Sequence, residues 1–370
     1  MTVAAQTANT EAPDQAIGDD PSDVQLELYP ADLLSDPDWD KNVLAHPNTT
    51  TFHTSHWTRV LHKTYGHKTF GLRFVRGDQT VAMLPMMEVK SPITGRRGIA
   101  MPFSDFCEPL KFQSFGSDSL VQKLSGLSRE RRWRYFEIRG GRLQLPPNAA
   151  PSERYYGHRL SLTGGVEEVE SHLAPSVRRA IRKAKLSDLT VAISTTSDAV
   201  RDFYRLHTQT RKRHGVPPQP FSFFRHIHQE ILSRGLGFIV IAKMARKLLA
   251  AAVFFHAGRT GLFKFGASDQ NYLRLRANNI VMWEGIQHLI QLGVQSLQFG
   301  RTDIDNAGLR RFKLGWGAKE ELIEYFKFDI ASHNWAGCGT RPSHIINGLF
   351  RALPLTANRF AGALIYPHLD

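Results

Sequence analysis

Three cations stand within one turn of a short helical run near the end of the chain. The segment GLRRFKLGWG places Arg310, Arg311 and Lys313 just before a Leu-Gly-Trp corner. Clustered cations attract phosphates and other anions. The competing interpretation is that all three form the solvated face of a short helix. We therefore treat this segment as a candidate anion site.

A second group of cations lies in SHLAPSVRRAIRKAKLS, where apolar residues recur at helical spacing. The cations on the remaining faces are Arg178, Arg179, Arg182 and Lys183, followed by Lys185. One face of this helix is expected to pack, and the other to bind a polyanion such as RNA or to remain solvated. No aromatic residue interrupts the run, so base stacking is not expected there.

The composition indicates anionic partners and argues against a metal-binding, membrane-spanning or secreted protein. The 370 residues carry a formal charge of +13, and the two cysteines have no metal-ligand spacing. No apolar run approaches the roughly 18 residues of a membrane span, and the first residues do not resemble a signal peptide. We expect a cytoplasmic protein, with contact at the inner face of the membrane as an option, and neither a metal site nor a DNA partner.

Composition, together with residues that end helices and strands, divides the chain into four parts. The first residues lack periodicity and aromatic residues, which predicts a disordered tail. A helix at HWTRVLHKTY and a hairpin turning at Gly77 and Asp78 follow. The expected parts are the tail at 1–23, a first domain at 24–160, a second domain at 161–335 and an amphipathic segment at 336–370 that packs on the first domain.

The second half has well-marked helix ends. One helix is predicted to begin at a Ser197 or Asp198 cap and to end at Gly215, and another to begin at an Asn cap and end before Gly293. The predicted order is two helices, three strands, a helix, a strand, a short helix and a strand.

That order resembles the GNAT acyltransferase fold, and its closing segment is the most specific part. Asn306, Leu309, Phe312, Gly315 and Trp316 stand where the closing GNAT helix and turn have similar residues. A weaker helix and hairpin in the first half resembles a degenerate second copy. Two such domains with a basic helix between them resemble the FemAB-like aminoacyltransferases, over about residues 45 to 365. This resemblance implies an α/β (α+β) fold of tandem GNAT-like domains, with mixed twisted sheets flanked by helices.

The resemblance also bears on the acyl donor. Ordinary GNAT enzymes bind the coenzyme A pyrophosphate on a glycine-containing loop, but the matching loop YLRLRANN has no glycine, and Arg311 stands where a general-acid tyrosine is common. FemAB-like enzymes use aminoacyl-tRNA instead. We expect that donor, with acyl-coenzyme A as the alternative, and no other cofactor.

The same resemblance assigns roles to side chains. Lys313, after Phe312, would stabilise the oxyanion of the tetrahedral intermediate, while Arg310 and Arg311 would hold phosphates. Asp269 is a candidate acceptor of the amine proton, although an Asp that caps a turn is the commoner role. The remaining substrate-binding candidates are Phe103 and Asp105 in RGIAMPFSDFCEPL, Arg213 at a helix end, and Tyr272 and Arg276 in the loop, each with a simple structural alternative.

The resemblance implies an N-acyltransferase that modifies an amine of a cell-envelope precursor or polysaccharide. The segment TRKRHGVPPQP is similar to a CelD/BcsL-like branch associated with exopolysaccharide systems. Two alternatives stay open, namely an acyl-coenzyme A-dependent N-acetyltransferase of polysaccharide biosynthesis and a non-catalytic scaffold that binds a polyanion. The final segment is expected to pack on the protein, with docking on a membrane surface as the other interpretation.

Overall fold

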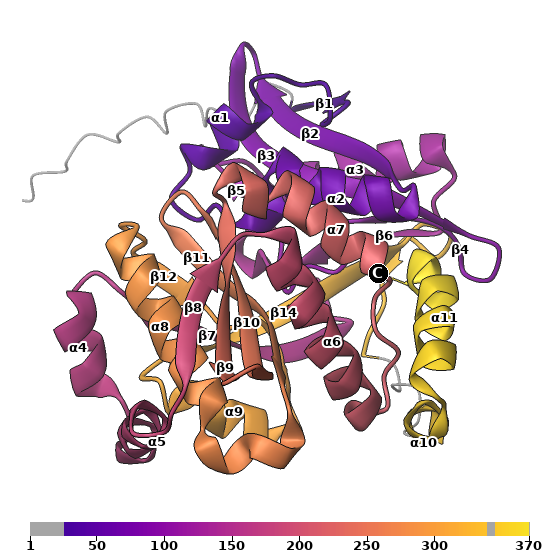
Figure 1. Cartoon of the computed structure of the whole chain (residues 1–370). Coiled ribbons are helices and arrows are strands. Elements are labelled where there is room, and N and C mark those ends of the chain that lie inside the picture. The colour runs from indigo at the N-terminus through magenta and orange to yellow at the C-terminus, as the bar shows by residue number, and fades with distance from the viewer. Residues whose placement is uncertain (1–25, 339–344, 370) are drawn as a thin grey trace, which may run out of the picture.

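The computed structural model describes residues 26–338 and 345–369. The expected tail at 1–23 lies outside the described residues. Within them, fifteen strands form one mixed sheet, with the main path β1-β2-β3-β4-β6-β14-β7-β12-β11-β10-β9-β8. This sheet runs through both halves of the protein, and helices cover its faces (Figure 1).

The first half contains the strands at the β1 end of that path. They are β1 (Glu27–Ala31), β2 (Lys68–Arg76), β3 (Gln79–Ser91), β4 (Gly95–Ile99), β5 (Leu110–Lys111) and β6 (Tyr135–Arg139). The helices are α1 (Trp39–Leu44), α2 (Ser55–Tyr65) and α3 (Ser117–Arg131). The predicted helix and antiparallel hairpin are confirmed as α2 and β2–β3, which turn at Gly77 with φ of +57°.

From α6 to β14 the second half follows the predicted order, apart from the short strand β13, and the prediction did not include β7, β8, β15 or α4. Its strands are β7 (Glu153–Ser161), β8 (Thr190–Ser194), β9 (Gly237–Met244), β10 (Lys247–Ala257), β11 (Thr260–Ser268), β12 (Ser296–Gln298), β13 (Thr302–Asp303), β14 (Lys319–Asp329) and β15 (Asn334–Trp335). The helices are α4 (Gly165–His172), α5 (Pro175–Lys185), α6 (Ser197–His214), α7 (Phe221–Glu230), α8 (Ala277–Gln291) and α9 (Ala307–Leu314).

Alternation along the central strands explains why helices cover both faces. In β9, Phe238 and Val240 join the core under α8 and α5, whereas Ile239 and Ile241 join the core under α2, α6 and α7. Successive strand residues point to opposite faces, so a strand that is apolar at every position needs cover on both sides. The sheet is therefore the middle layer of three in this half (Figure 1).

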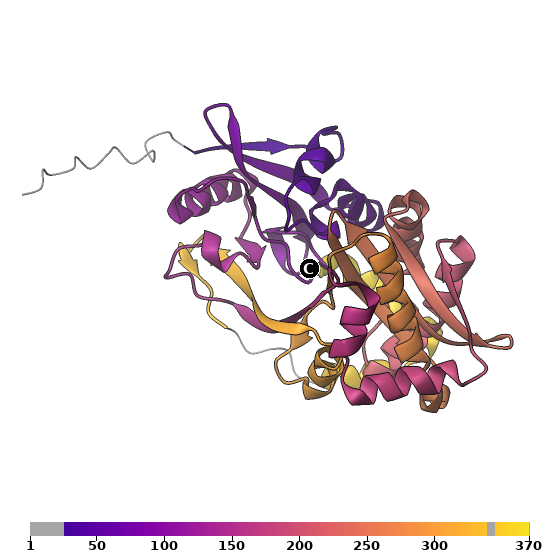
Figure 2. The same cartoon turned by 90° about the vertical axis from the view of Figure 1, so that its left-hand side faces the viewer.

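Two strands join the halves by crossing between them. β7 pairs with β12 in the second half, and β14, which comes from the second half, pairs with β6 in the first. β7 and β14 also pair with each other over seven residues, from Lys319↔Arg159 to Tyr325↔Glu153. Figure 2 shows β14 reaching across toward the first half beside β7. The two halves thus share one hydrogen-bonded sheet.

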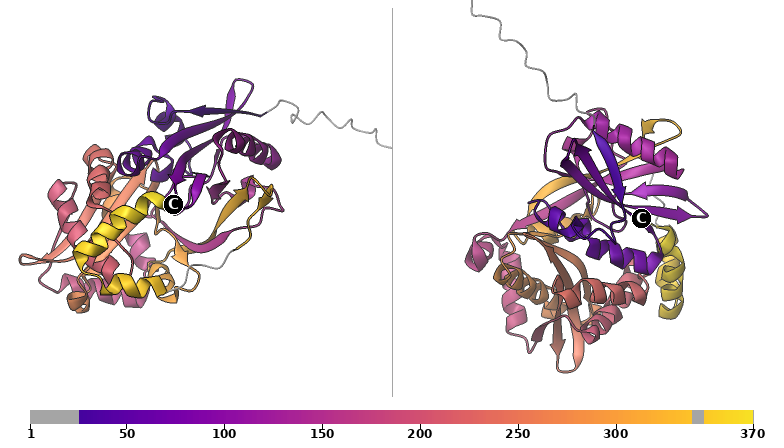
Figure 3. Two further views of the ribbon diagram at one scale, coloured as in Figure 1. Left: turned by 90° about the vertical axis from the view of Figure 1, so that its right-hand side faces the viewer. Right: turned by 90° about the horizontal axis from the view of Figure 1, so that it is seen from above.

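The amphipathic segment forms α10 (Ile345–Ala352), α11 (Leu355–Ile365) and a final turn, η6 (Tyr366–His368). We expected it to pack on the first domain. Instead α10 and α11 lie against α6 of the second half, and the final turn contacts β3 (Figure 3). Gly362 permits this packing because a Cβ there would stand 2.0 Å from the carbonyl oxygen of Pro218. No helix in the described part of the chain is long and apolar enough to cross a membrane.

Two predicted helix caps are wrong by a residue or more. The cap of α6 is Thr196, whose side chain accepts from the backbone N–H of Ala199, rather than Ser197 or Asp198. Helix α8 begins after Arg276, which has left-handed φ of +58°, rather than at an asparagine. The predicted stop of α6 is confirmed, with Gly215 in the left-handed conformation.

Candidate functional site

A cavity of about 560 Å³ opens where two parallel strands of the sheet separate. β12 pairs with only the first three residues of β11, ending at Leu262↔Gln298. The rest of β11, residues 263–268, forms one wall of the cavity, and residues 299–301 after β12 form another. The separation of the strands therefore creates the space, and α6, α8 and α9 close it.

The floor of this cavity carries a buried ion pair. The Nζ of Lys264 donates to a carboxylate oxygen of Asp105 at 3.0 Å and to the Phe103 carbonyl at 2.8 Å. Burial alone would raise the pKa of Asp105, but Lys264 and Arg301 hold it below its usual value. Burial also lowers the pKa of Lys264, against the opposing effect of Asp105. Asp105 is thus an ionised carboxylate inside the protein.

Lys313 lies in the same cavity, on α9. Its side chain is buried, with 3% of the residue exposed, and Nζ donates to the carbonyls of Gly300 at 2.8 Å and Arg301 at 3.0 Å. Burial lowers its pKa to about 8, although Asp105 and Asp303 act in the opposite direction. An ammonium has three N–H groups, so one donor remains for a ligand in the cavity.

Arg301 and Tyr325 fix the loop that carries Asp105. Arg301 donates to the Tyr325 hydroxyl at 2.6 Å, and that hydroxyl lies 2.8 Å from the Asp105 carbonyl oxygen. The Arg301 guanidinium also lies 4.6 Å from the centre of the Tyr155 ring. Among the described residues that line the cavity, Asp105 is the single carboxylate, whereas the cations are Arg211, Arg213, Lys264, Arg301 and Lys313. The cavity therefore favours a ligand with negative charge.

A second, shallower cavity of about 520 Å³ lies between α5, α9 and the start of α8. We call it the cationic groove. No described acidic residue lines it. Its lining includes four cations, Arg179, Lys183, Arg276 and Arg311. The groove lies at the N-terminus of α8, where the helix dipole favours an anion.

The loop before α8 has no glycine, yet it takes a glycine-like conformation. Arg276 has φ of +58°, a left-handed value that non-glycine residues adopt at a cost and that is common at functional sites. This conformation places Arg276 in the lining of the cationic groove. Phe312 lines both the cationic groove and the cavity that holds Lys313. The two spaces therefore lie on either side of one side chain.

The structure brings together only some of the residues predicted from the sequence. Asp105, Arg213, Phe312 and Lys313 line the cavity, and Arg179, Lys183, Arg276 and Arg311 line the groove. Arg178 and Arg182 belong to α5 but line neither space. Phe103 contributes its carbonyl oxygen to Lys264, while its ring packs near Tyr65 and Tyr366.

Three predicted residues have structural roles instead. Asp269 caps the turn that begins η5 (Gln270–Leu275) by accepting from Asn271 N–H, and it lines neither space. Tyr272 lies under the Lys247 ammonium, 4.3 Å from the ring centre. Arg310 donates two hydrogen bonds to Glu320, at 2.6 and 2.8 Å. That bidentate pair joins α9 to β14.

Sequence reasoning missed Lys264, Arg301 and Tyr325. Lys264 had a readable signal, because it stands between phenylalanines in the strand-like run LFKFGAS, where a cation interrupts an apolar pattern. Arg301 had a weaker signal, a cation directly after the glycine that ends a strand. Tyr325 had none, since it comes from β14 and contacts a loop 220 positions earlier in the chain. No group of three or more His, Cys, Asp or Glu in the described residues is placed to hold a metal ion.

Comparison with known families supports the GNAT-like fold of the second half. The family model described as an acetyltransferase (GNAT) domain matches residues 172–321, which include α5, the strands around the cavity and α9. No curated protein sequence matches the chain significantly.

Solved structures resemble nearly the whole described chain. FemX has a TM-score of 0.62 at 14% identity, covering 80% of this chain and 96% of its own. A tandem GNAT protein from the clavulanic acid biosynthesis pathway has a TM-score of 0.54 at 10% identity, covering 85% and 100%. L-PGS from Bacillus licheniformis has a TM-score of 0.53 at 10% identity, covering 85% and 96%. The expected fold of tandem GNAT-like domains is therefore confirmed, in a GNAT/FemX-like arrangement.

Proposed function

We propose that this protein is an N-acyltransferase that moves an aminoacyl or acyl group from a phosphate-bearing donor to an amine. The observation that carries the proposal is the pair of spaces that share Phe312. The groove has four cations for donor phosphates, and the cavity has the buried Lys313 for the acyl oxygen. A donor with phosphates at one end and an activated acyl group at the other would occupy both.

The transfer step follows from the groups in the cavity. The acceptor amine binds beside Asp105, and its nitrogen attacks the acyl carbonyl carbon. Lys313 donates to the oxygen that becomes negative. A C–N bond forms, the C–O bond of an ester or the C–S bond of a thioester breaks, and the amine proton passes to the leaving oxygen or sulfur. His207 also lines the cavity, but burial lowers its pKa to about 3, so it stays neutral.

Aminoacyl-tRNA is our preferred donor, because the cations of α5 extend beyond the groove to Arg178 and Arg182 and can meet a longer polyanion. Acyl-coenzyme A is the second candidate, because the groove lies at the start of the 15-residue helix α8 and Arg276 supplies the left-handed turn that a glycine loop would give. The acceptor we propose is an amine of a cell-envelope precursor or exopolysaccharide. The latter rests on the resemblance of TRKRHGVPPQP to the CelD/BcsL-like branch.

Product analysis tests the proposal. Purified protein is incubated with cell-envelope precursors and either charged tRNA or labelled acetyl-coenzyme A. The masses of the precursors are then measured by mass spectrometry. We expect an added mass on an amine with charged tRNA. Transfer from acetyl-coenzyme A alone would favour the second donor. Tight polyanion binding without transfer from either donor would favour a non-catalytic scaffold and contradict the proposal.

A further inference from the structure

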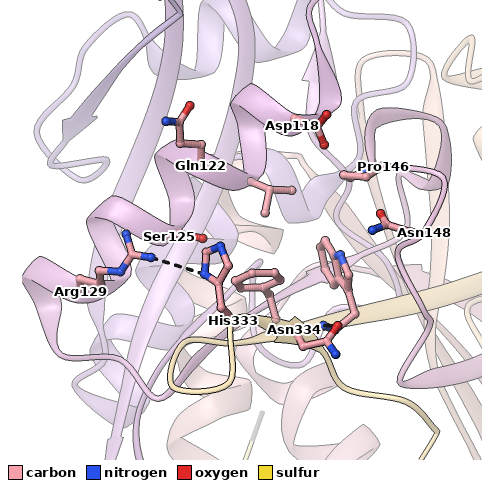
Figure 4. Close-up of a pocket in the computed structure, with 11 residues that line it drawn as sticks. Asp118, Gln122, Ser125, Arg129, Pro146, Asn148, His333 and Asn334 are labelled. Atoms are coloured by element: carbon pink, nitrogen blue, oxygen red, sulfur yellow. Dashed lines mark hydrogen bonds between the residues drawn. The ribbon is translucent and has the colours of Figure 1, made fainter.

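A third cavity, of about 460 Å³, lies in the first half and shares no lining residue with the two spaces above. One wall is α3, and the other is the turn between β14 and β15 together with the loop near Pro146 (Figure 4). Nothing in the transfer reaction makes use of it. We call it the α3 cavity.

One face of α3 lines this cavity. Asp118, Gln122, Ser125 and Arg129 follow one another at intervals of three or four residues, which places them on the same side of the helix. Facing them are His333 and its neighbours, as Figure 4 shows. Asp118, Gln122 and Arg129 are exposed on this face, whereas Ser125 is buried, and Val121 adds apolar surface to the lining.

Ser125 is the strongest indication that this cavity binds a ligand. The residue is 2% exposed, and its hydroxyl oxygen has no hydrogen-bond partner among the described residues. Buried hydroxyl groups are nearly always paired, because an unpaired one has lost its hydration without compensation. In Figure 4, the Ser125 hydroxyl lies beside His333, and both residues line the cavity. A ligand group that donates or accepts a hydrogen bond there would satisfy it.

The charge of the lining selects among ligands. The chain carries +13, yet the α3 cavity has one carboxylate, Asp118, and one guanidinium, Arg129. Arg129 is also 3.4 Å from the His333 ring nitrogen. The lining is thus close to neutral, which offers no advantage to phosphates or nucleic acid. The cationic groove, by contrast, is lined by four cations and no described acidic residue.

The remaining lining groups match a hydroxyl-rich ligand. Gln122, Asn148 and Asn334 supply amides, which both donate and accept hydrogen bonds, as sugar hydroxyls do. Trp335 and Pro146 supply apolar surface for the C–H face of a sugar ring. Trp335 is held in place by Phe328, with ring centres 5.1 Å apart. Apolar surface with a few convergent polar groups is the usual composition of a small-molecule site.

We propose that the α3 cavity binds a neutral saccharide. The proposal does not depend on the transfer reaction, because it rests on binding at residues that line neither the Lys313 cavity nor the cationic groove.

Saturation-transfer NMR and titration calorimetry of the full chain test it, with cellobiose, maltose and N,N′-diacetylchitobiose as probes. We expect at least one of them to bind, and the double variant Gln122→Ala/Asn148→Ala to weaken it by about tenfold or more, as expected for two lost hydrogen bonds. Both side chains are exposed, so the fold should be retained. Gln291→Ala, an exposed glutamine at the end of α8, is the matched control and should bind like the unmodified protein.

Three outcomes would overturn the inference. They are no binding of any of the three saccharides, binding that the double variant leaves unchanged, and binding of triglycine or uridine monophosphate at these residues in place of the sugars. The readout is binding, so a failure here is distinguishable from a failure of the transfer assay.

Discussion

Lys313 differs from a surface lysine in two ways. It is buried, and two of its three N–H groups are fixed on the carbonyls of Gly300 and Arg301. A cation held in this way is positioned before charge develops on a substrate and need not reorganise. Its position in the cavity is therefore suited to an oxyanion.

Replacing Lys313 with Met removes the charge and keeps much of the side-chain length. We expect turnover to fall by roughly 100-fold to 1000-fold, the usual cost of one lost oxyanion donor. Lys313→Arg should restore little, because a planar guanidinium directs its donors differently. Single-turnover assays measure the effect, with the exposed Lys319→Met as control and thermal melts to show that each variant is folded. Normal turnover in folded Lys313→Met would remove this residue from the mechanism.

The pKa of Lys313 predicts a pH dependence. The lysine must be protonated to act, and burial lowers its pKa to about 8. The active form is therefore present below about pH 8 and is lost as the pH rises through that value. We expect kcat/KM at fixed acceptor to decline above about pH 8. The residual activity of Lys313→Arg should lack this decline, because a guanidinium does not titrate there; an unchanged decline would assign it to another group.

Individual site residues could be predicted from the sequence where the motif that indicated them was local. Phe312 and Lys313 are adjacent, and their resemblance to FemAB-like enzymes selected a residue that the structure places in the cavity. Asp269 and Arg310 were poor candidates because short-range partners occupy them, a turn in one case and Glu320 in the other. Whether a polar side chain serves its own loop or a cavity depends on contacts that spacing does not reveal.

Among the elements, the separation of β11 from β12 decides where the site lies. The chain turns away after β12 at Gly300, with φ of +69°, and a Cβ there would stand 3.1 Å from a carboxylate oxygen of Asp105. Any other residue would be strained and would also press on the ion pair with Lys264. Gly300 therefore serves both the turn and the close approach of Asp105.

Gly300→Ala tests this double role. We expect a loss of stability of about 1 to 3 kcal/mol from the left-handed backbone, and in addition a fall in turnover because Asp105 must move. Gly293→Ala is the control, since Gly293 has φ of +76° and open space at its Cβ. It should lose stability while keeping activity. Urea midpoints and turnover of the two variants give the comparison, and equal turnover would argue against a role for Asp105.

The cationic groove predicts a salt dependence. Binding to tRNA should weaken steeply as salt rises, because neutralised phosphates release counterions. Arg179→Gln/Lys183→Gln should reduce the slope of log K against log salt by roughly 1 to 2, since two contacts are lost. Arg201→Gln/Arg205→Gln on α6, outside both spaces, is the control. A slope that is the same in both double variants would show that RNA binds elsewhere.

For the whole molecule, the crossing of β7 and β14 joins the halves through the pairs β7–β12, β7–β14 and β14–β6. Separate unfolding would require breaking the strand pairs between them. We expect one calorimetric unfolding transition whose van't Hoff and calorimetric enthalpies agree. Two resolved transitions would show that the halves are energetically independent despite the shared sheet.

The sequence predicted the helices and strands better than it predicted which strands pair with one another. Alternation and turn residues marked β2, β3 and the three central strands, because those signals are local. The pairing of β14 with β6 joins Phe328 to Phe136, almost 200 positions apart, and no pattern in either strand specifies the other. The same limit applies to the cavity, whose walls come from β11, α9 and the loop of Asp105.

The central claim is that the cationic groove and the Lys313 cavity hold two ends of one donor, and single-turnover kinetics against donor concentration test it most directly. Arg179→Gln/Lys183→Gln should raise the donor concentration for half-maximal rate while leaving the maximal rate nearly unchanged, as expected for lost ground-state binding. Lys313→Met should lower the maximal rate and leave that concentration nearly unchanged. A groove variant with the donor dependence of the unmodified protein would contradict the account.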